Sequence, residues 1–237
     1  NEPGPLLTLG LRFTVQIALL NTASALTSPA YGVLILNSYA VFTNLIGHFF
    51  SRYSVGADLE ERLTPTRIAG LLLSFAGIAI LTFGQPASRL APRPILGNCI
   101  MTISCFLLGA RQVHTRWVVQ SIEPVRAIIW QMLCSLPLFF GVAALTEPLT
   151  LKQINLEAVL AISYQGVIVA GLCFIIWAQL LQRHAAGALS MYAFLVPVSG
   201  VALSSVFFGE KLRPQLLLGA AFVFAGVYIV SGKAKAT

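Results

Sequence analysis

The chain has 237 residues, of which 57% are apolar and only 10% are charged, and its mean hydropathy is +0.83. Soluble domains are about 25% charged, so this composition excludes an ordinary water-soluble enzyme, and it also excludes collagen, coiled coils and disordered chains. The net charge of +7 does not indicate a nucleic-acid partner, because no run of adjacent basic residues forms a phosphate-binding stripe. The composition predicts an all-α bundle of membrane-spanning helices, surrounded by the lipid bilayer.

Eight apolar runs are long enough to cross a bilayer, and short polar or Gly/Pro-bearing breaks separate them. In chain order they are residues 6–26, 29–50, 66–85, 95–117, 125–146, 156–181, 187–208 and 214–232. The runs are about twice as long as the strands of a membrane β-barrel and do not alternate apolar with polar residues. The sequence therefore predicts eight transmembrane helices.

The third and eighth runs belong to an internal repeat. Residues 61–83 align without gaps with residues 210–232, and eight of the 23 positions are identical, Glu61 with Glu210 among them. Five crossings separate the two copies, and an odd number of crossings reverses the direction of the chain. The alignment predicts two inverted-topology repeats of five spans each, a construction that many secondary transporters use.

The repeat also predicts the domain organisation. Residues 1–86 are expected to form the remainder of the first repeat, spans three to five of the complete protein, and residues 87–237 the second repeat, spans six to ten. Two spans are expected before residue 1, which is Asn rather than an initiator Met. Lys and Arg fall ten against five on alternating sides, which predicts a cytoplasmic C-terminus.

The most characteristic stretch is LSMYAFLVPVSGVALSSVFFGEKLRPQLLLGAAFVFAGVYIV at 189–230, in which a Pro-bearing span ends in Gly-Glu and a Gly/Ala-rich span follows. This pattern resembles the drug/metabolite transporter superfamily, specifically its EamA-type ten-span exporters, over nearly the whole chain. The resemblance implies outward transport across a bacterial inner membrane. The first repeat departs from the pattern, because aligning Phe49-Phe50 with Phe207-Phe208 places Tyr39 where Pro197 stands.

Neutral polar side chains lie along the second run. Asn37, Asn44 and His48 are spaced i, i+7 and i+11, which places them on one face of a continuous helix. Unpaired amides are costly in lipid, so this face is expected to look toward neighbouring helices or a pore. Hydrogen bonding between helices and contact with a substrate are both open.

Arg111 is the strongest ionisable candidate for a functional role. It follows the apolar run at 95–110. Either it faces a water-filled cavity and attracts an anionic or zwitterionic substrate, or it snorkels to the cytoplasmic interface.

Aromatic and neutral polar residues of the sixth and seventh runs complete the predicted site. Trp177 and Tyr192 either line a central cavity or belong to an interfacial aromatic belt. Gln179 aligns with Asn21 in the repeat. The predicted substrate-binding residues are Asn21, Asn37, Tyr39, Asn44, Arg111, Trp177, Gln179, Tyr192 and Ser199.

Pro197 and Gly200 form a predicted hinge, because a Pro inside a span removes a backbone hydrogen bond and kinks the helix. Interrupted spans are typical of binding sites near the midplane of transporters. A static bend is the alternative.

The sequence shows no motif for ATP hydrolysis, zinc proteolysis or serine hydrolysis, and no acidic residue falls clearly in the middle of a span. We therefore expect no catalytic residue, no metal site and no cofactor, and the chain is not expected to be an enzyme. The sequence predicts a secondary transporter that exports small organic metabolites such as amino acids by alternating access. The alternative is a non-transporting membrane scaffold or regulatory subunit with the same fold. The oligomeric state is not indicated.

Overall fold

The structure is a computed structural model that describes residues 3–51, 64–146, 155–183 and 195–231. The described residues are helical apart from short connections, and the only β-pairing among them is an isolated bridge between Ser88 and Ala91. The prediction of an all-α fold is confirmed.

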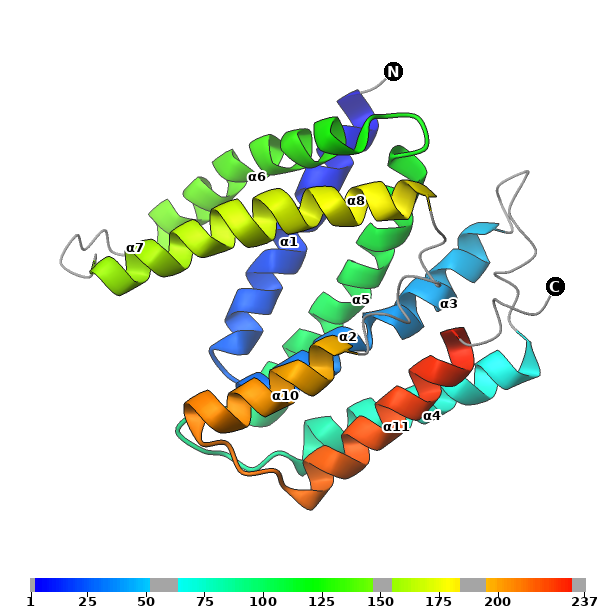
Figure 1. Ribbon diagram of the computed structural model, residues 1–237, viewed down its shortest axis with the longest axis vertical. Coiled ribbons are helices and arrows are strands. Elements are labelled where there is room, and N and C mark those ends of the chain that lie inside the picture. Colours follow the sequence, from blue (N-terminus) through cyan, green and yellow to red (C-terminus); the bar gives the residue numbers. More distant parts are fainter. Residues whose placement is uncertain (1–2, 52–63, 147–154, 184–194, 232–237) are drawn as a thin grey trace. The chain divides into compact units, whose positions relative to one another are not determined.

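The chain divides into two compact units. The smaller unit comprises residues 1–14 and 114–185, and the larger unit comprises residues 15–113 and 186–237. Two long helices, α1 (Pro3–Ser24) and α5 (Pro94–Val118), contribute to both units. The larger unit also contains α2 (Pro29–Asn37), α3 (Tyr39–Ser51), α4 (Pro65–Gly84), α10 (Leu195–Phe208) and α11 (Pro214–Ser231). Figure 1 shows these helices along the chain.

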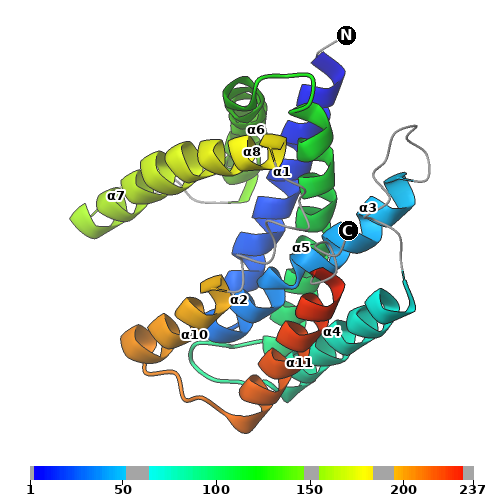
Figure 2. The same ribbon diagram turned by 45° about the vertical axis from the view of Figure 1, so that its right-hand side comes forward.

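The closest helix packing in the larger unit is between α4 and α11, which lie side by side in Figures 1 and 2. Gly70 meets Gly226, and Gly77 meets Gly219. Because the residue number rises along one helix while it falls along the other, the two helices run antiparallel. A methyl group built on Gly70 would lie 2.9 Å from the carbonyl oxygen of Gly226, so glycine is what allows this approach.

Local sequence signals explain where the helices begin. Thr64 caps α4, because its side chain accepts a hydrogen bond from the backbone N–H of Arg67, and Pro65 occupies the first helical position. Pro29 likewise occupies the first helical position of α2. The buried side chains of the larger unit then close its core, which includes Leu34, Ile35, Leu81, Met101, Leu216 and Val223.

The second predicted span consists of two helices rather than one. α2 ends at Asn37 and α3 begins at Tyr39, with Ser38 between them in a turn. The expectation that Asn37 and Asn44 lie on one continuous helix is therefore wrong in detail.

The smaller unit contains α6 (Pro124–Thr146) and a long helical segment made of α7 (Leu156–Ser163), the π-helix η3 (Tyr164–Cys173) and α8 (Phe174–Arg183). Phe13 of α1 contacts Phe139 and Phe174 edge to face, with ring centroids 6.4 and 6.1 Å away. These contacts tie α1, α6 and α8 together.

Six helical segments within the described residues are long and apolar enough to cross a membrane, with α2 and α3 counted together as one and α7, η3 and α8 as another. Residues 199–208 and 214–230 form shorter apolar helices. Large apolar side chains cover the outer surfaces, for example Phe140 with 71% of its surface exposed and Val206 with 78%. Such surfaces need an apolar environment. The protein is a multi-pass membrane protein. The count of eight spans stays a prediction, since part of the run at 187–208 lies outside the described residues.

Candidate functional site

The amides predicted to line the second span hydrogen-bond within their own helices. The Nδ2 group of Asn37 donates to the carbonyl oxygen of Val33 at 2.7 Å, and that of Asn44 donates to the carbonyl oxygen of Ala40 at 2.7 Å. Both side chains are half-buried. These bonds satisfy amide donors within each helix. Bonding between helices and contact with a substrate both stay predictions for the two residues.

Two of the predicted residues flank the break at Ser38, since Asn37 precedes it and Tyr39 follows it. Ser38 is fully buried, and its hydroxyl donates to the carbonyl oxygen of Ile35. The thiol of Cys105 on α5 donates to the carbonyl oxygen of Leu36 at 3.4 Å. Side chains thus satisfy two backbone carbonyls at the end of α2, which is how an interrupted helix remains stable inside a membrane.

Other predicted residues of the larger unit have different surroundings. Arg111 on α5 is buried, with 9% of its surface exposed. Asn21 on α1 is exposed. Ser199 on α10 is also exposed, and its hydroxyl donates to the carbonyl oxygen of Val196 at 3.0 Å.

The hinge residues lie in α10. Gly200 packs against α2, where a methyl group built on it would lie 2.9 Å from both terminal carbons of Val33. Pro197 is the third residue of α10, and residues 184–194, which precede this helix, lie outside the described part. The hinge therefore stays a prediction.

The remaining predicted residues come from elsewhere in the chain. Trp177 is half-buried and Gln179 is exposed on α8, which belongs to the smaller unit. Tyr192 lies outside the described residues. Asn37 and Tyr39 flank the break at Ser38, where the sequence itself makes them near neighbours.

The most extensive polar contacts of the larger unit surround Glu210, which lies in the link between α10 and α11. Its carboxylate accepts hydrogen bonds from the hydroxyl of Ser28, from the hydroxyl of Ser204 at 2.6 Å and from the backbone N–H of Ala30 at 3.2 Å. Ser28 occupies the N-cap position of α2 but makes no capping bond with its own side chain. Glu210 therefore caps α2 from a distant part of the sequence.

These contacts continue into the protein. Gln85, after the end of α4, donates from Nε2 to the hydroxyl of Ser28 at 2.8 Å. Asn98 of α5 donates from Nδ2 to Oε1 of Gln85 at 2.8 Å, and the hydroxyl of Thr27 lies 2.7 Å from that same oxygen. We call the six residues Thr27, Ser28, Gln85, Asn98, Ser204 and Glu210 the Glu210 network. It joins the start of α2, the end of α4, the first turns of α5 and the end of α10.

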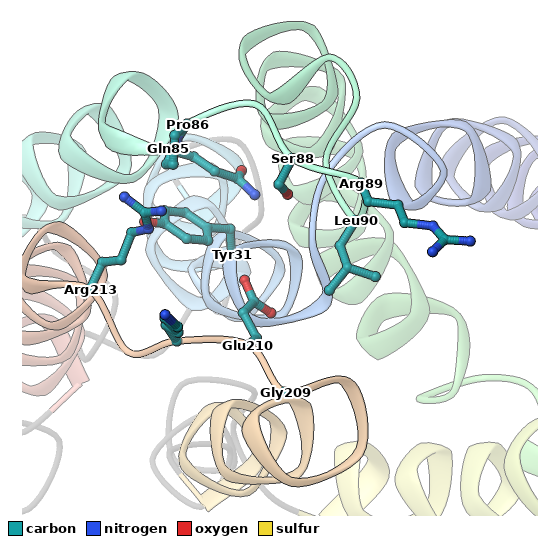
Figure 3. Close-up of a pocket in the computed structure, with 10 residues that line it drawn as sticks. Tyr31, Gln85, Pro86, Ser88, Arg89, Leu90, Gly209, Glu210 and Arg213 are labelled. Atoms are coloured by element: carbon teal, nitrogen blue, oxygen red, sulfur yellow. The ribbon is translucent and has the colours of Figure 1, made fainter.

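A hollow of about 230 Å³ adjoins this network. Figure 3 shows its lining, which includes Tyr31 of α2, Gln85, Arg89, Glu210 and Arg213. Sequence reasoning missed the hollow and the network, since each of their residues lies near an end of a run or in a link. The available signals were Glu61 and Glu210, which the repeat alignment pairs, and the polar Asn98 near the start of an apolar run.

Comparison with known proteins identifies the family of this chain. The model of the EamA-like transporter family matches residues 95–232, which is more than half of the chain. The chain belongs to the EamA-like transporter family. As predicted from the sequence, it is thus a transporter of the drug/metabolite transporter superfamily.

Relatives of this EamA-like transporter carry consistent names. The chain is 27% identical to the "Probable amino-acid metabolite efflux pump" of Salmonella typhimurium, over 94% of this chain and 75% of the relative. It is 18% identical to the "Uncharacterized transporter YoaV" of Bacillus subtilis, over 80% of this chain and 62% of that protein. A solved crystal structure covers the whole chain with a TM-score of 0.69 and 20% identity, and the chain covers 79% of that structure. This structural match concerns the fold alone.

Proposed function

We propose that this EamA-like transporter is a secondary carrier that exports small organic metabolites by alternating access. Amino acids are the substrate class that we favour, because one relative is named for amino-acid metabolite efflux. The proposed carrier consists of two inverted repeats, residues 1–86 and 87–237, in a bacterial inner membrane with a cytoplasmic C-terminus.

The packing of α4 against α11 supports the inverted arrangement. The repeat alignment equates Gly70 with Gly219 and Gly77 with Gly226. Under this equivalence the contact of Gly70 with Gly226 becomes the contact of Gly77 with Gly219, so the two observed contacts exchange with each other. Antiparallel packing of equivalent helices is what a two-fold axis in the membrane plane produces.

The observation that carries the proposed site is the interrupted span at Ser38. Helix breaks inside a membrane occur where the backbone is buried in protein or lines a cavity, and they are typical of substrate sites in transporters. Tyr39, next to the break, is the residue that aligns with Pro197 in the second repeat. We propose that the two positions are equivalent hinges and that Asn37 and Tyr39 contact the substrate.

Cysteine accessibility tests this site in the full-length protein reconstituted in liposomes. Cysteine at position 37 or 39 should react with a water-soluble maleimide, and a mixture of amino acids should slow the reaction by occupying the site. Phe140→Cys is the matched control, because its exposed side chain on α6 would contact lipid and should stay unlabelled. Wild-type protein, with its four free cysteines, gives the background.

The proposed site is wrong if both cysteines remain as unreactive as the control while the variants elute as folded protein in size-exclusion chromatography. Labelling that amino acids do not slow would keep the cavity but reject amino acids as the substrate class.

A further inference from the structure

The hollow beside the Glu210 network carries a surplus of positive charge. Three basic residues line it, Arg89, Lys211 and Arg213, and Glu210 is the acidic residue among the lining side chains. Glu210 already accepts three hydrogen bonds from neutral donors. Because these donors are neutral, Glu210 keeps its negative charge, and the three basic residues outnumber it in the lining.

Tyr31 supplies a hydrogen-bond donor with nothing to bind. Only 2% of the Tyr31 surface is exposed, and its hydroxyl has no hydrogen-bond partner among the described residues. Buried hydroxyls without a partner are uncommon, because their desolvation is not compensated. Figure 3 shows the Arg213 guanidinium close to the hydroxyl end of the Tyr31 ring, whereas the Arg89 side chain points away from both. Tyr31 thus combines with a nearby cation at one end of the hollow.

A ligand that fits these groups has to supply acceptors and negative charge. A carboxylate or phosphate does both, since its oxygens accept from a phenol and pair with a guanidinium or an ammonium group. The ring of Tyr31, with Pro86 and Leu90, adds an apolar wall. The volume of about 230 Å³ lies below the range of about 300–1,000 Å³ that is usual for drug-sized ligands, so a small anion or one head group fits best.

We propose that this hollow binds a small organic anion through its carboxylate or phosphate group, with Tyr31 donating a hydrogen bond and Arg213 and Lys211 supplying the charge. None of these residues belongs to the substrate site proposed above, and the binding does not depend on transport. The anion comes either from solution or from the head group of an acidic phospholipid. In both cases the recognising chemistry is the same.

Binding is measured on the full-length protein in nanodiscs, with two arms that separate the two sources. In the first arm, equilibrium dialysis with radiolabelled benzoate, and separately with inorganic phosphate, uses discs of neutral phosphatidylcholine. In the second arm, discs contain phosphatidylglycerol, and native mass spectrometry counts the lipid molecules retained by the protein. Saturable binding in the first arm assigns the site to a soluble anion, and retention in the second arm alone assigns it to a lipid.

Three variants make the test specific. Tyr31→Phe removes the hydroxyl and keeps the ring, and should weaken binding about tenfold, because hydrogen bonds to charged groups are among the strong ones. Arg213→Gln should weaken it roughly fivefold and reduce its dependence on salt, since Arg213 is exposed and screened. Arg93→Gln is the matched control: it removes an equal charge from another exposed link, the one between α4 and α5, but Arg93 does not line the hollow.

The proposal is overturned if neither arm shows saturable binding, or if Arg93→Gln weakens binding as much as Arg213→Gln does, which would indicate general charge attraction. It is also overturned if Tyr31→Phe binds like wild type. Circular dichroism and size-exclusion profiles must match the wild type for each variant, and Tyr31→Phe preserves the packing of the ring.

Discussion

Replacing Gly226 by Ala tests the packing of α4 against α11. A methyl group on residue 226 would lie 2.1 Å from the side-chain oxygen of Ser74 and 2.5 Å from the carbonyl oxygen of Gly70. The Ser74 side chain can rotate, but the backbone carbonyl of Gly70 cannot move without its helix. The distance from the new methyl group to this carbonyl oxygen is about 0.9 Å shorter than the 3.4 Å at which an ordinary contact begins. The two helices therefore have to separate by most of an ångström.

We expect this separation to lower the free energy of unfolding by about 1–3 kcal/mol, the usual range for overpacking. The better helix propensity of Ala returns at most about 1 kcal/mol. With that full gain the net loss is about 0–2 kcal/mol. Gly77→Ala should behave in the same way, because its methyl group would lie 2.7 Å from the backbone nitrogen of Val223.

Thermal melting in detergent, followed by size-exclusion chromatography, measures this loss. Gly141→Ala is the matched control, since a methyl group built on Gly141 of α6 meets nothing within 4 Å. A Gly226→Ala protein that melts at or above the temperature of Gly141→Ala would refute the close packing of α4 with α11.

Substitutions at three further positions test other contacts by the same melting assay. Glu210→Ala should lower stability by about 2–4 kcal/mol, because three donors lose their acceptor. Glu210→Gln keeps one acceptor oxygen and should lose less. Equal melting temperatures of the two variants would contradict the capping role. Asn98→Leu should lower stability by about 1–3 kcal/mol, since Gln85 loses a buried donor, and a neutral effect would contradict the bond. Phe13→Leu removes two edge-to-face ring contacts and should lower stability by about 1–2 kcal/mol; wild-type melting would argue against them.

The membrane fold could be predicted because bilayer thickness imposes long apolar helices, and such helices are visible in composition and run length. The predicted repeat rests in part on Gly70 and Gly77, which align with Gly219 and Gly226. The same four glycines form the close contact of α4 with α11, where small residues are hard to replace. The break at Ser38 could not be predicted, because a serine within an apolar run looks like any helical residue. The stabilising bond from Cys105 comes from another helix.

The Glu210 network shows why the candidate site was only partly predictable. Two of its members that hydrogen-bond directly, Ser28 and Glu210, lie 182 residues apart in the chain. Single-sequence reasoning detects residues that share one helix face, and it has no means of pairing the link before α11 with the start of α2. The amides of Asn37 and Asn44 illustrate the converse, because their shared spacing suggested a common face whereas each donates to its own helix backbone.

Counterflow tests the central claim most directly. Liposomes containing the full-length protein are preloaded with an unlabelled compound, and uptake of its labelled form is followed across a panel of amino acids, nucleosides, sugars and organic acids. We predict saturable uptake of at least one amino acid, reduced by Tyr39→Ala and unchanged by Gly141→Ala. The absence of saturable uptake for every compound, with protein that melts cooperatively, would contradict the carrier and favour a non-transporting scaffold.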